Sequence, residues 1–198
     1  MTKETKQNGF YPQRQGLYDP LFEKDACGVG MVCSLKGERS HDIVVKALQV
    51  LANLEHRGAT GYDPETGDGA GITLQLPHEF FRTQVRDLPE LGTYGVGMVF
   101  LPQDPESRHA CEQTLEKCFA AEGLQTIAWR DVPVRPEAVG ELGRGMMPCI
   151  RQIFVGCGQV APEHLDRQLF IARKLAENEV RNSGGKDSGH FYLPSCSS

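Results

Sequence analysis

The order of helices and strands predicted along this chain places it in a mixed α and β fold class. Segments with the two-residue period of strands alternate with segments that have the helical period, and alternation taken alone favours a parallel α/β sheet. The length of 198 residues and the apolar content of 39% fit one domain with a single core. The formal charge of −5, from 21 basic and 26 acidic side chains, argues against nucleic acid as the main partner.

Each element follows from a local pattern. Strands are predicted where short apolar runs are bounded by glycine, proline or polar residues, at 27–33, 72–76, 94–101, 124–131, 149–156 and 190–193. Helices are predicted where apolar side chains recur every three or four residues, at 40–56, 77–81, 105–123 and 162–180. Ser40 is the expected cap of the first helix, and Pro77 is the expected first residue of the second. Irregular chain is expected at 132–148 and 182–189.

Two helices have a predicted apolar face. In the first helix it consists of Ile43, Ala47, Leu48, Leu51 and Leu54. In the last helix it consists of Leu165, Leu169, Ile171, Ala172 and Leu175.

Several classes of protein are excluded by what the sequence lacks. No glycine group completes GxGxxG and no GxxxxGK[ST] is present, so nucleotide binding has no support. No apolar run approaches the ~18–20 residues that span a bilayer, and the polar N-terminus is no secretory signal. These features predict a soluble, cytoplasmic protein that binds neither membrane nor nucleic acid.

The seven cysteines show no pattern of a metal site or a disulfide framework. No CxxC pair and no Cys/His cluster at zinc-ligand spacing occurs, so no metal is expected. Most of these thiols are expected to be small buried side chains. Cys111 and Cys118 lie seven residues apart in a predicted helix, on one face and in or near the core.

Cys27 stands apart because it opens the glycine-rich strand Cys27-Gly28-Val29-Gly30 after a polar leader. If the chain is cut before Cys27, the thiol and an α-amino group of pKa about 7.7–8.0 belong to one residue. That amine can take the proton of a thiol of pKa about 8.5, which gives a nucleophile with its own base. A structural cysteine buried in a strand is the alternative.

A second candidate is His56-Arg57-Gly58-Ala59 at the end of the first predicted helix. Arg57 can bind a carboxylate through two hydrogen bonds or hold a thiolate in place. The alternative is a helix that ends in His-Arg against its own dipole and is closed by Gly58.

Three motifs in order then carry a family resemblance: Asp25-Ala26-Cys27-Gly28-Val29-Gly30, His56-Arg57-Gly58-Ala59 and Thr66-Gly67-Asp68-Gly69-Ala70-Gly71-Ile72. The segments 18–25, 94–101, 129–133, 169–174 and 191–198 fit as well. Over nearly its whole length, the chain resembles the N-terminal domain of the glutamate synthase large-subunit family. That domain is a class II glutamine amidotransferase of the N-terminal-nucleophile type.

The resemblance implies a fold and a set of site residues. The family fold is α+β, a four-layer αββα sandwich of two mostly antiparallel sheets, and it replaces the parallel sheet that alternation favours. Residues 1–26 correspond to a propeptide, and 27–198 to the N-terminal part of the amidotransferase domain. Cys27 corresponds to the catalytic nucleophile that attacks glutamine. Arg57 corresponds to an arginine near it, and Gly58 and the loop 67–71 match positions that shape the substrate pocket.

The resemblance also implies partners outside this segment. The ammonia would pass to a downstream synthase domain that makes glutamate from 2-oxoglutarate with FMN and an iron–sulfur cluster, and electrons would come from a reductase subunit or ferredoxin. No cofactor is expected in residues 1–198. The family's oxyanion pair and remaining substrate-binding groups lie farther downstream, and one lost oxyanion donor costs about 10²–10³ in rate. We therefore expect a fragment, truncated on its C-terminal side, that is inactive or incompletely folded alone.

Two other interpretations remain open at this point. The chain can be another class II glutamine amidotransferase with the same nucleophile. It can also be a non-catalytic fragment in which Cys27 is structural. Only the enzymes should react at Cys27 with a glutamine-like electrophile.

Overall fold

The computed structural model describes residues 28–55, 58, 66–67, 69–183 and 188–198. The chain divides into two compact units, one formed by residues 1–61 and 67–72 and the other by residues 62–66 and 73–198. No helix in the described part of the chain is long and apolar enough to cross a membrane.

The first unit contains helix α1 (His41–Asn53), within the helix predicted at 40–56. None of its residues is fully buried, and Leu48 on the predicted apolar face is 51% exposed. Ser40 stands at the N-cap with extended backbone, but its side chain makes no capping hydrogen bond. The helix is therefore placed correctly by its periodicity, while its expected core is not formed within this unit.

The strands predicted at 27–33 and 72–76 are absent from the described residues. Residues 28–34 and 69–76, without residue 27, have no strand assignment. A strand exists only when a neighbouring chain pairs with its N–H and C=O groups. Apolar patterning identified the segments, but no described segment forms a ladder with them, and so the prediction of paired strands is wrong here.

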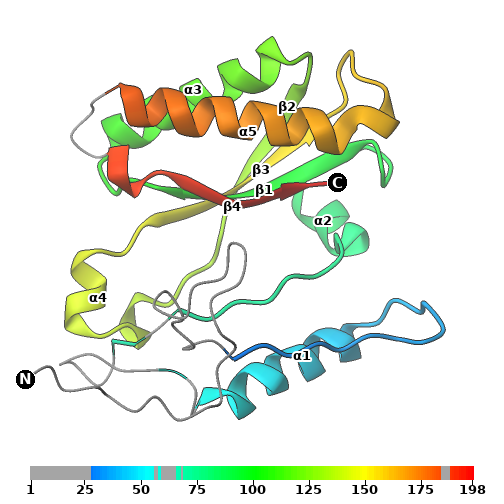
Figure 1. The fold of residues 1–198 in the computed structure, drawn as a ribbon, viewed down its shortest axis with the longest axis vertical. Helices are drawn as coiled ribbons and strands as arrows, with labels where there is room; N and C mark the ends of the chain where they lie inside the picture. The colour runs from blue at the N-terminus through cyan, green and yellow to red at the C-terminus, as the bar shows by residue number, and fades with distance from the viewer. Residues whose placement is uncertain (1–27, 56–57, 59–65, 68, 184–187) are drawn as a thin grey trace, which may run out of the picture. The chain divides into compact units, whose positions relative to one another are not determined.

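The second unit is built on a four-stranded sheet (Figure 1). Its strands are β1 (Tyr94–Leu101), β2 (Gln125–Asp131), β3 (Cys149–Gly156) and β4 (Tyr192–Ser197). They lie in the order β2-β3-β1-β4, and every neighbouring pair is antiparallel. The parallel sheet favoured by alternation is therefore wrong for this unit, and an antiparallel sheet, as the resemblance implies, is found.

The helices of this unit are α2 (His78–Gln84), α3 (Pro105–Ala121), α4 (Glu141–Gly145) and α5 (Leu165–Asn182). Short 3₁₀ turns occur at Pro136–Ala138, Pro162–His164 and Ser188–His190. Pro77 caps α2 instead of opening it. Helix α4 lies inside the stretch expected to be irregular, where two glycines and a short length weaken the helical signal.

Helix α3 shows how local residues set the element bounds. The Asp104 carboxylate accepts a hydrogen bond from the Ser107 N–H at 2.8 Å, and this bond lowers the pKa of Asp104. Pro105 is the first helical residue, where its missing N–H is harmless. Gly123 ends the helix with φ of +77°, a conformation that glycine adopts at little cost. The positions of Pro105 and Gly123 were predicted from the sequence, whereas the Asp104 cap was not.

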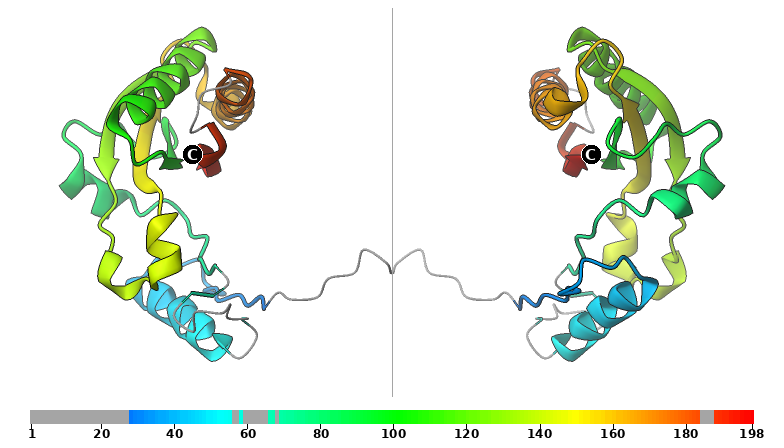
Figure 2. Two further views of the ribbon diagram at one scale, coloured as in Figure 1. Left: turned by 90° about the vertical axis from the view of Figure 1, so that its left-hand side faces the viewer. Right: turned by 90° about the vertical axis from the view of Figure 1, so that its right-hand side faces the viewer.

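One face of the sheet is covered by α3 and α5, which Figure 2 shows on the same side of the strands. From the strands, Val99 of β1 and Ile153 of β3 are fully buried in this core. Cys111 and Cys118 of α3 are buried in it as expected. The buried stripe of α5 is Leu165, Leu169, Ala172, Ala176 and Val180. The prediction was wrong for Ile171, which is half-buried, and for Leu175, which is 45% exposed.

The opposite face of the sheet carries a smaller apolar cluster with α2. Phe154 lies fully buried against Phe81, with ring centroids 5.0 Å apart in an edge-to-face arrangement. Farther along this face, Phe100 of β1 stacks on Tyr192 of β4 at 4.6 Å, and Tyr192 remains 48% exposed. Strand β4 runs four residues beyond the predicted end at 193, because its backbone continues to pair with β1 as far as Ser197.

Candidate active site

Of the predicted site residues, the structure describes Gly58; Cys27 and Arg57 lie outside the described residues. Gly58 follows α1, is exposed, and donates its N–H to the Glu55 carbonyl at 3.0 Å. A Cβ built on Gly58 would meet that carbonyl oxygen at 3.4 Å, an ordinary contact. The backbone at this position therefore has no steric need for glycine, and its role beside a substrate stays a prediction.

The glycine-rich loop after the first helix is exposed where it is described. Gly69 and Gly71 both face open space, where a Cβ would meet no other atom within 4 Å. Asp68 lies outside the described residues. An open backbone of this kind can approach a ligand closely.

After the undescribed residue 27, the chain has no regular secondary structure as far as Ser34, and its side chains differ in exposure. Val29, Met31 and Leu35 are 89%, 87% and 98% exposed, whereas Val32 and Ser34, in the other phase, are half-buried. Gly30 is exposed, yet a Cβ built on it would overlap Cγ1 of Val50 in α1. Sequence analysis did not identify Val50 as a neighbour of this segment. A glycine inside a strand pattern is the signal that marks such a contact.

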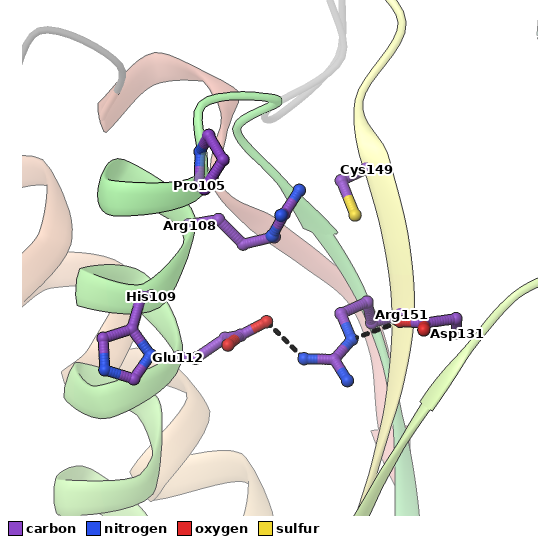
Figure 3. Close-up of a pocket in the computed structure, with 7 residues that line it drawn as sticks. All are labelled: Pro105, Arg108, His109, Glu112, Asp131, Cys149 and Arg151. Atoms are coloured by element: carbon purple, nitrogen blue, oxygen red, sulfur yellow. Dashed lines mark hydrogen bonds and ion pairs between the residues drawn. The ribbon is translucent and has the colours of Figure 1, made fainter.

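In the second unit, a pocket of about 500 Å³ lies between α3 and the strands β2 and β3 (Figure 3). Arg151 occupies its floor and forms ion pairs of 2.6 Å with both Glu112 and Asp131. Its guanidinium also lies 5.1 Å from the ring centre of Trp129. Burial lowers the pKa of Arg151, but the hydrogen bonds and charges of the two carboxylates outweigh it and raise the pKa above its ordinary value.

The remaining groups of this pocket do not form a catalytic set. The His109 ring is hydrogen-bonded to Gln113 on the next turn of α3 at 3.0 Å, and it lies away from the Cys149 thiol (Figure 3). A nucleophilic cysteine needs a base within hydrogen-bonding reach. The Arg151 network is therefore best explained as a clamp that holds α3 on the sheet.

Among the described cysteines, Cys33 is exposed, Cys111 and Cys118 are buried, and Cys149, Cys157 and Cys196 are partly buried. Burial raises the pKa of Cys196 to about 12. Burial, assisted by a 3.5 Å hydrogen bond to Glu179, raises the pKa of Cys118 to about 11. Because the thiolate is the reactive form, these side chains are poor nucleophiles at neutral pH.

We expect alkylation to distinguish these thiols from the exposed Cys33. A pKa near 11 or 12 leaves Cys118 and Cys196 almost wholly protonated at pH 7, and the thiolate fraction rises about tenfold per pH unit up to the pKa. Iodoacetamide pulses between pH 7 and 9, read by peptide mass spectrometry, should modify Cys33 first and the other two at rates that climb with pH. Modification of Cys118 as fast as Cys33 at pH 7 would contradict this assignment.

Metal binding finds no support in the geometry. The described residues contain no group of three or more His, Cys, Asp or Glu side chains that could hold an ion. The thiols that an iron–sulfur cluster would require are not gathered in this part of the chain. These residues therefore do not fit a cluster.

Comparison with known proteins identifies the kind of chain. Residues 27–198 match the family model described as class-II glutamine amidotransferases. The chain is 42% identical over 191 residues to the large chain of the NADPH glutamate synthase of Bacillus subtilis (strain 168). The match covers 94% of this chain and 12% of the relative. It is 41% identical over 175 residues to ferredoxin-dependent glutamate synthase 1 of Arabidopsis thaliana. That match covers 85% of this chain and 11% of the relative.

A fungal relative shows the same relation. The NADH glutamate synthase of Schizosaccharomyces pombe (strain 972) is 37% identical to this chain over 200 residues. The match covers 93% of this chain and 9% of the relative. The chain thus spans about a tenth of the length of these relatives. The printed names of the three relatives differ in the electron donor, which is NADPH, ferredoxin or NADH.

Proposed function

Because the chain belongs to the class-II glutamine amidotransferases, we propose that it is the glutamine-hydrolysing part of a glutamate synthase. The observation that carries this proposal is the start of the family match at residue 27. The same residue is the cysteine that sequence analysis selects as a nucleophile. Relatives at 37–42% identity that are named glutamate synthases favour this enzyme over other members of the class.

In the proposed reaction, Cys27 becomes the first residue of the mature protein when residues 1–26 are removed. Its α-amine accepts the thiol proton, and the thiolate attacks the side-chain carbonyl carbon of glutamine. The C–N bond breaks, ammonia leaves with the transferred proton, and a glutamyl thioester remains. Water then hydrolyses the thioester, which releases glutamate and restores the thiol.

The supporting roles go to residues near this nucleophile in the sequence. We assign Arg57 to the surroundings of the thiol, where its charge favours the thiolate. Gly58 and the loop 67–71 are assigned to the wall of the glutamine pocket. The exposure of Gly58, Gly69 and Gly71 is compatible with a role beside a ligand.

For the fold, we propose that the described sheet is one layer of a four-layer αββα sandwich. Helices α3 and α5 form the layer outside it. Phe100 and Tyr192 lie on its other face and are only partly covered. A sheet face that packs against a second sheet would carry such apolar side chains.

The rest of the proposed enzyme acts on the ammonia. We propose that a synthase domain downstream in the same protein uses FMN and an iron–sulfur cluster to make glutamate from 2-oxoglutarate, in the cytoplasm. Electrons would arrive from a reductase subunit or ferredoxin. The described residues do not fit a cluster, and the glutaminase reaction proposed here involves neither group.

Covalent labelling tests this function directly. A diazoketone analogue of glutamine, incubated with the complete gene product, should alkylate Cys27 stoichiometrically, and excess glutamine should protect it. The exposed Cys33 provides an internal control, because it is six residues away and has no proposed role. Equal labelling of both cysteines, or none at Cys27, would contradict a glutamine site at residue 27.

A further inference from the structure

Strand β4 lies at one edge of the sheet, with helix α5 packed over it (Figure 1). Among the described strands, it pairs with β1 alone. In an antiparallel ladder, alternate residues direct their N–H and C=O groups to opposite sides, so part of the β4 backbone points away from β1. Such groups bind either water or the backbone of a further strand.

The two edges of the sheet are protected to different degrees. Strand β2, at the opposite edge, ends in Arg130 and Asp131, and charged side chains on an edge strand oppose pairing with further strands. Strand β4 has the sequence Tyr-Leu-Pro-Ser-Cys-Ser, without a charged side chain. Pro194 has no N–H and lies where the ladder with β1 is irregular. Pairing on the free edge is therefore expected at Ser195 to Ser197.

One side of α5 extends past this edge. Asp166 and Phe170 are one helical turn apart and share that side. The Asp166 carboxylate reaches the end of β4, where it accepts hydrogen bonds from the N–H and the hydroxyl of Ser198 at 2.8 and 3.0 Å. On the opposite side of α5, Glu179 accepts the thiol of Cys118 in α3 at 3.5 Å. The side that carries Phe170 thus points away from α3 and past β4.

Phe170 is 57% exposed on this overhanging side. Single exposed apolar side chains are common on protein surfaces, but this one coincides with an edge that lacks charged side chains. A strand added to β4 would lie beneath α5 on that side and cover the ring. The edge and the ring therefore suit the same occupant, an extended segment that offers backbone groups to β4 and an apolar side chain to Phe170.

We propose that this occupant is a strand of the same polypeptide, formed by residues that follow Ser198 in the complete gene product. This chain spans about a tenth of the length of its relatives, so a protein of that kind has ample chain to supply it. The Ser198 N–H points to a helix on one face of the sheet, so the backbone leaves the plane of the sheet there. A short turn at this point returns the chain along the free edge as an antiparallel strand. Cys27 and its chemistry play no part in this pairing.

Photo-crosslinking in the complete gene product identifies the occupant. With Phe170→p-benzoylphenylalanine, irradiation should attach the probe to a peptide that follows residue 198 of the same polypeptide. Leu175→p-benzoylphenylalanine is the matched control, because Leu175 is 45% exposed and lies one turn from Glu179, on the side of α5 that faces α3. The probe at position 175 should not give that product.

Amide hydrogen exchange of the unaltered complete gene product tests the pairing itself. At single-residue resolution, every amide of Ser195 to Ser197 should be as protected as those of the central strand β1, because paired N–H groups exchange only when the structure opens. Phe170→Ser should speed exchange at these three residues about tenfold or more, and Leu175→Ser should change it less than about threefold.

Several results would overturn the proposal. Exchange of alternate amides within 195–197 at the rate of unfolded chain would show that the edge remains open to water. A crosslink from position 170 to a second copy, or protection that disappears on dilution, would assign the edge to self-association. A crosslink to any other part of the protein would assign it to a different segment, and absence of any product would show that the ring faces water.

Discussion

Cys27→Ala is expected to abolish glutamine hydrolysis by the complete gene product. The proposed reaction passes through a thioester on this residue, and loss of a covalent nucleophile removes that path, a reduction of about 10⁴-fold or more. Ammonia release from glutamine measures it. Use of free ammonia by the proposed synthase domain should persist, because that step does not require the thiol. Intact mass should show an unaltered protein that begins at residue 27 and a Cys27→Ala protein that retains residues 1–26.

Cys33→Ala is the control for this experiment. It removes an exposed thiol of the same segment and should leave ammonia release and processing unchanged. Hydrolysis that survives in Cys27→Ala would exclude the thioester. A mature, active protein that retains residues 1–26 would remove the α-amine as base and contradict the mechanism in its present form.

Phe154→Ala is expected to cause the largest loss of stability among substitutions in the second unit. Phe154 is fully buried in the central strand β3, and its ring packs against Phe81 and Tyr94 at centroid distances of 5.0 and 6.5 Å. Truncation of a buried phenylalanine removes its burial energy and leaves a cavity, which lowers the free energy of unfolding by about 3–5 kcal/mol. In the complete gene product, amide hydrogen exchange of the β3 segment, read by peptide mass spectrometry, measures the loss as faster exchange.

Phe80→Ala is the matched control from the same cluster region. Phe80 is 48% exposed, and Arg130 lies 5.4 Å from its ring centre. Its truncation should lower the free energy of unfolding by about 1 kcal/mol or less. Equal losses for the two variants would mean that α2 does not pack on this face of the sheet as described. Phe154→Leu should fall between the two and provides a folded variant if alanine unfolds the chain.

Strands that lie within the described sheet were predicted well from the sequence. The bounds of β1 and β3 agree with the predicted 94–101 and 149–156, because long apolar runs between glycine, proline and polar residues identify buried strands. The direction of pairing was not predictable from the alternation of elements. Helices follow β1 and β3, yet β1 and β3 pair with each other in antiparallel register.

Exposed elements were predicted less well, because a period identifies an amphipathic segment without identifying its partner. The segment 28–34 has the alternation of a strand but no ladder, and α1 has an apolar face without a buried residue. On α5, packing selected Ala176 and Val180 for burial and left Leu175 45% exposed. The angle at which the helix crosses the sheet decides this choice, and helical period alone does not specify it.

The sequence by itself determined the family, because Cys27 and its neighbouring motifs keep their order and spacing along the chain, and such information is local and linear. It also determined the four strands and helices α2, α3 and α5 of the second unit, whereas α4 was missed and the strand predicted at 72–76 is absent. Only the tertiary structure decided the antiparallel order β2-β3-β1-β4, the clamp around Arg151 and the contact of Gly30 with Val50. Each of these joins residues twenty or more positions apart, and such pairings depend on how faces pack rather than on the preference of any one residue.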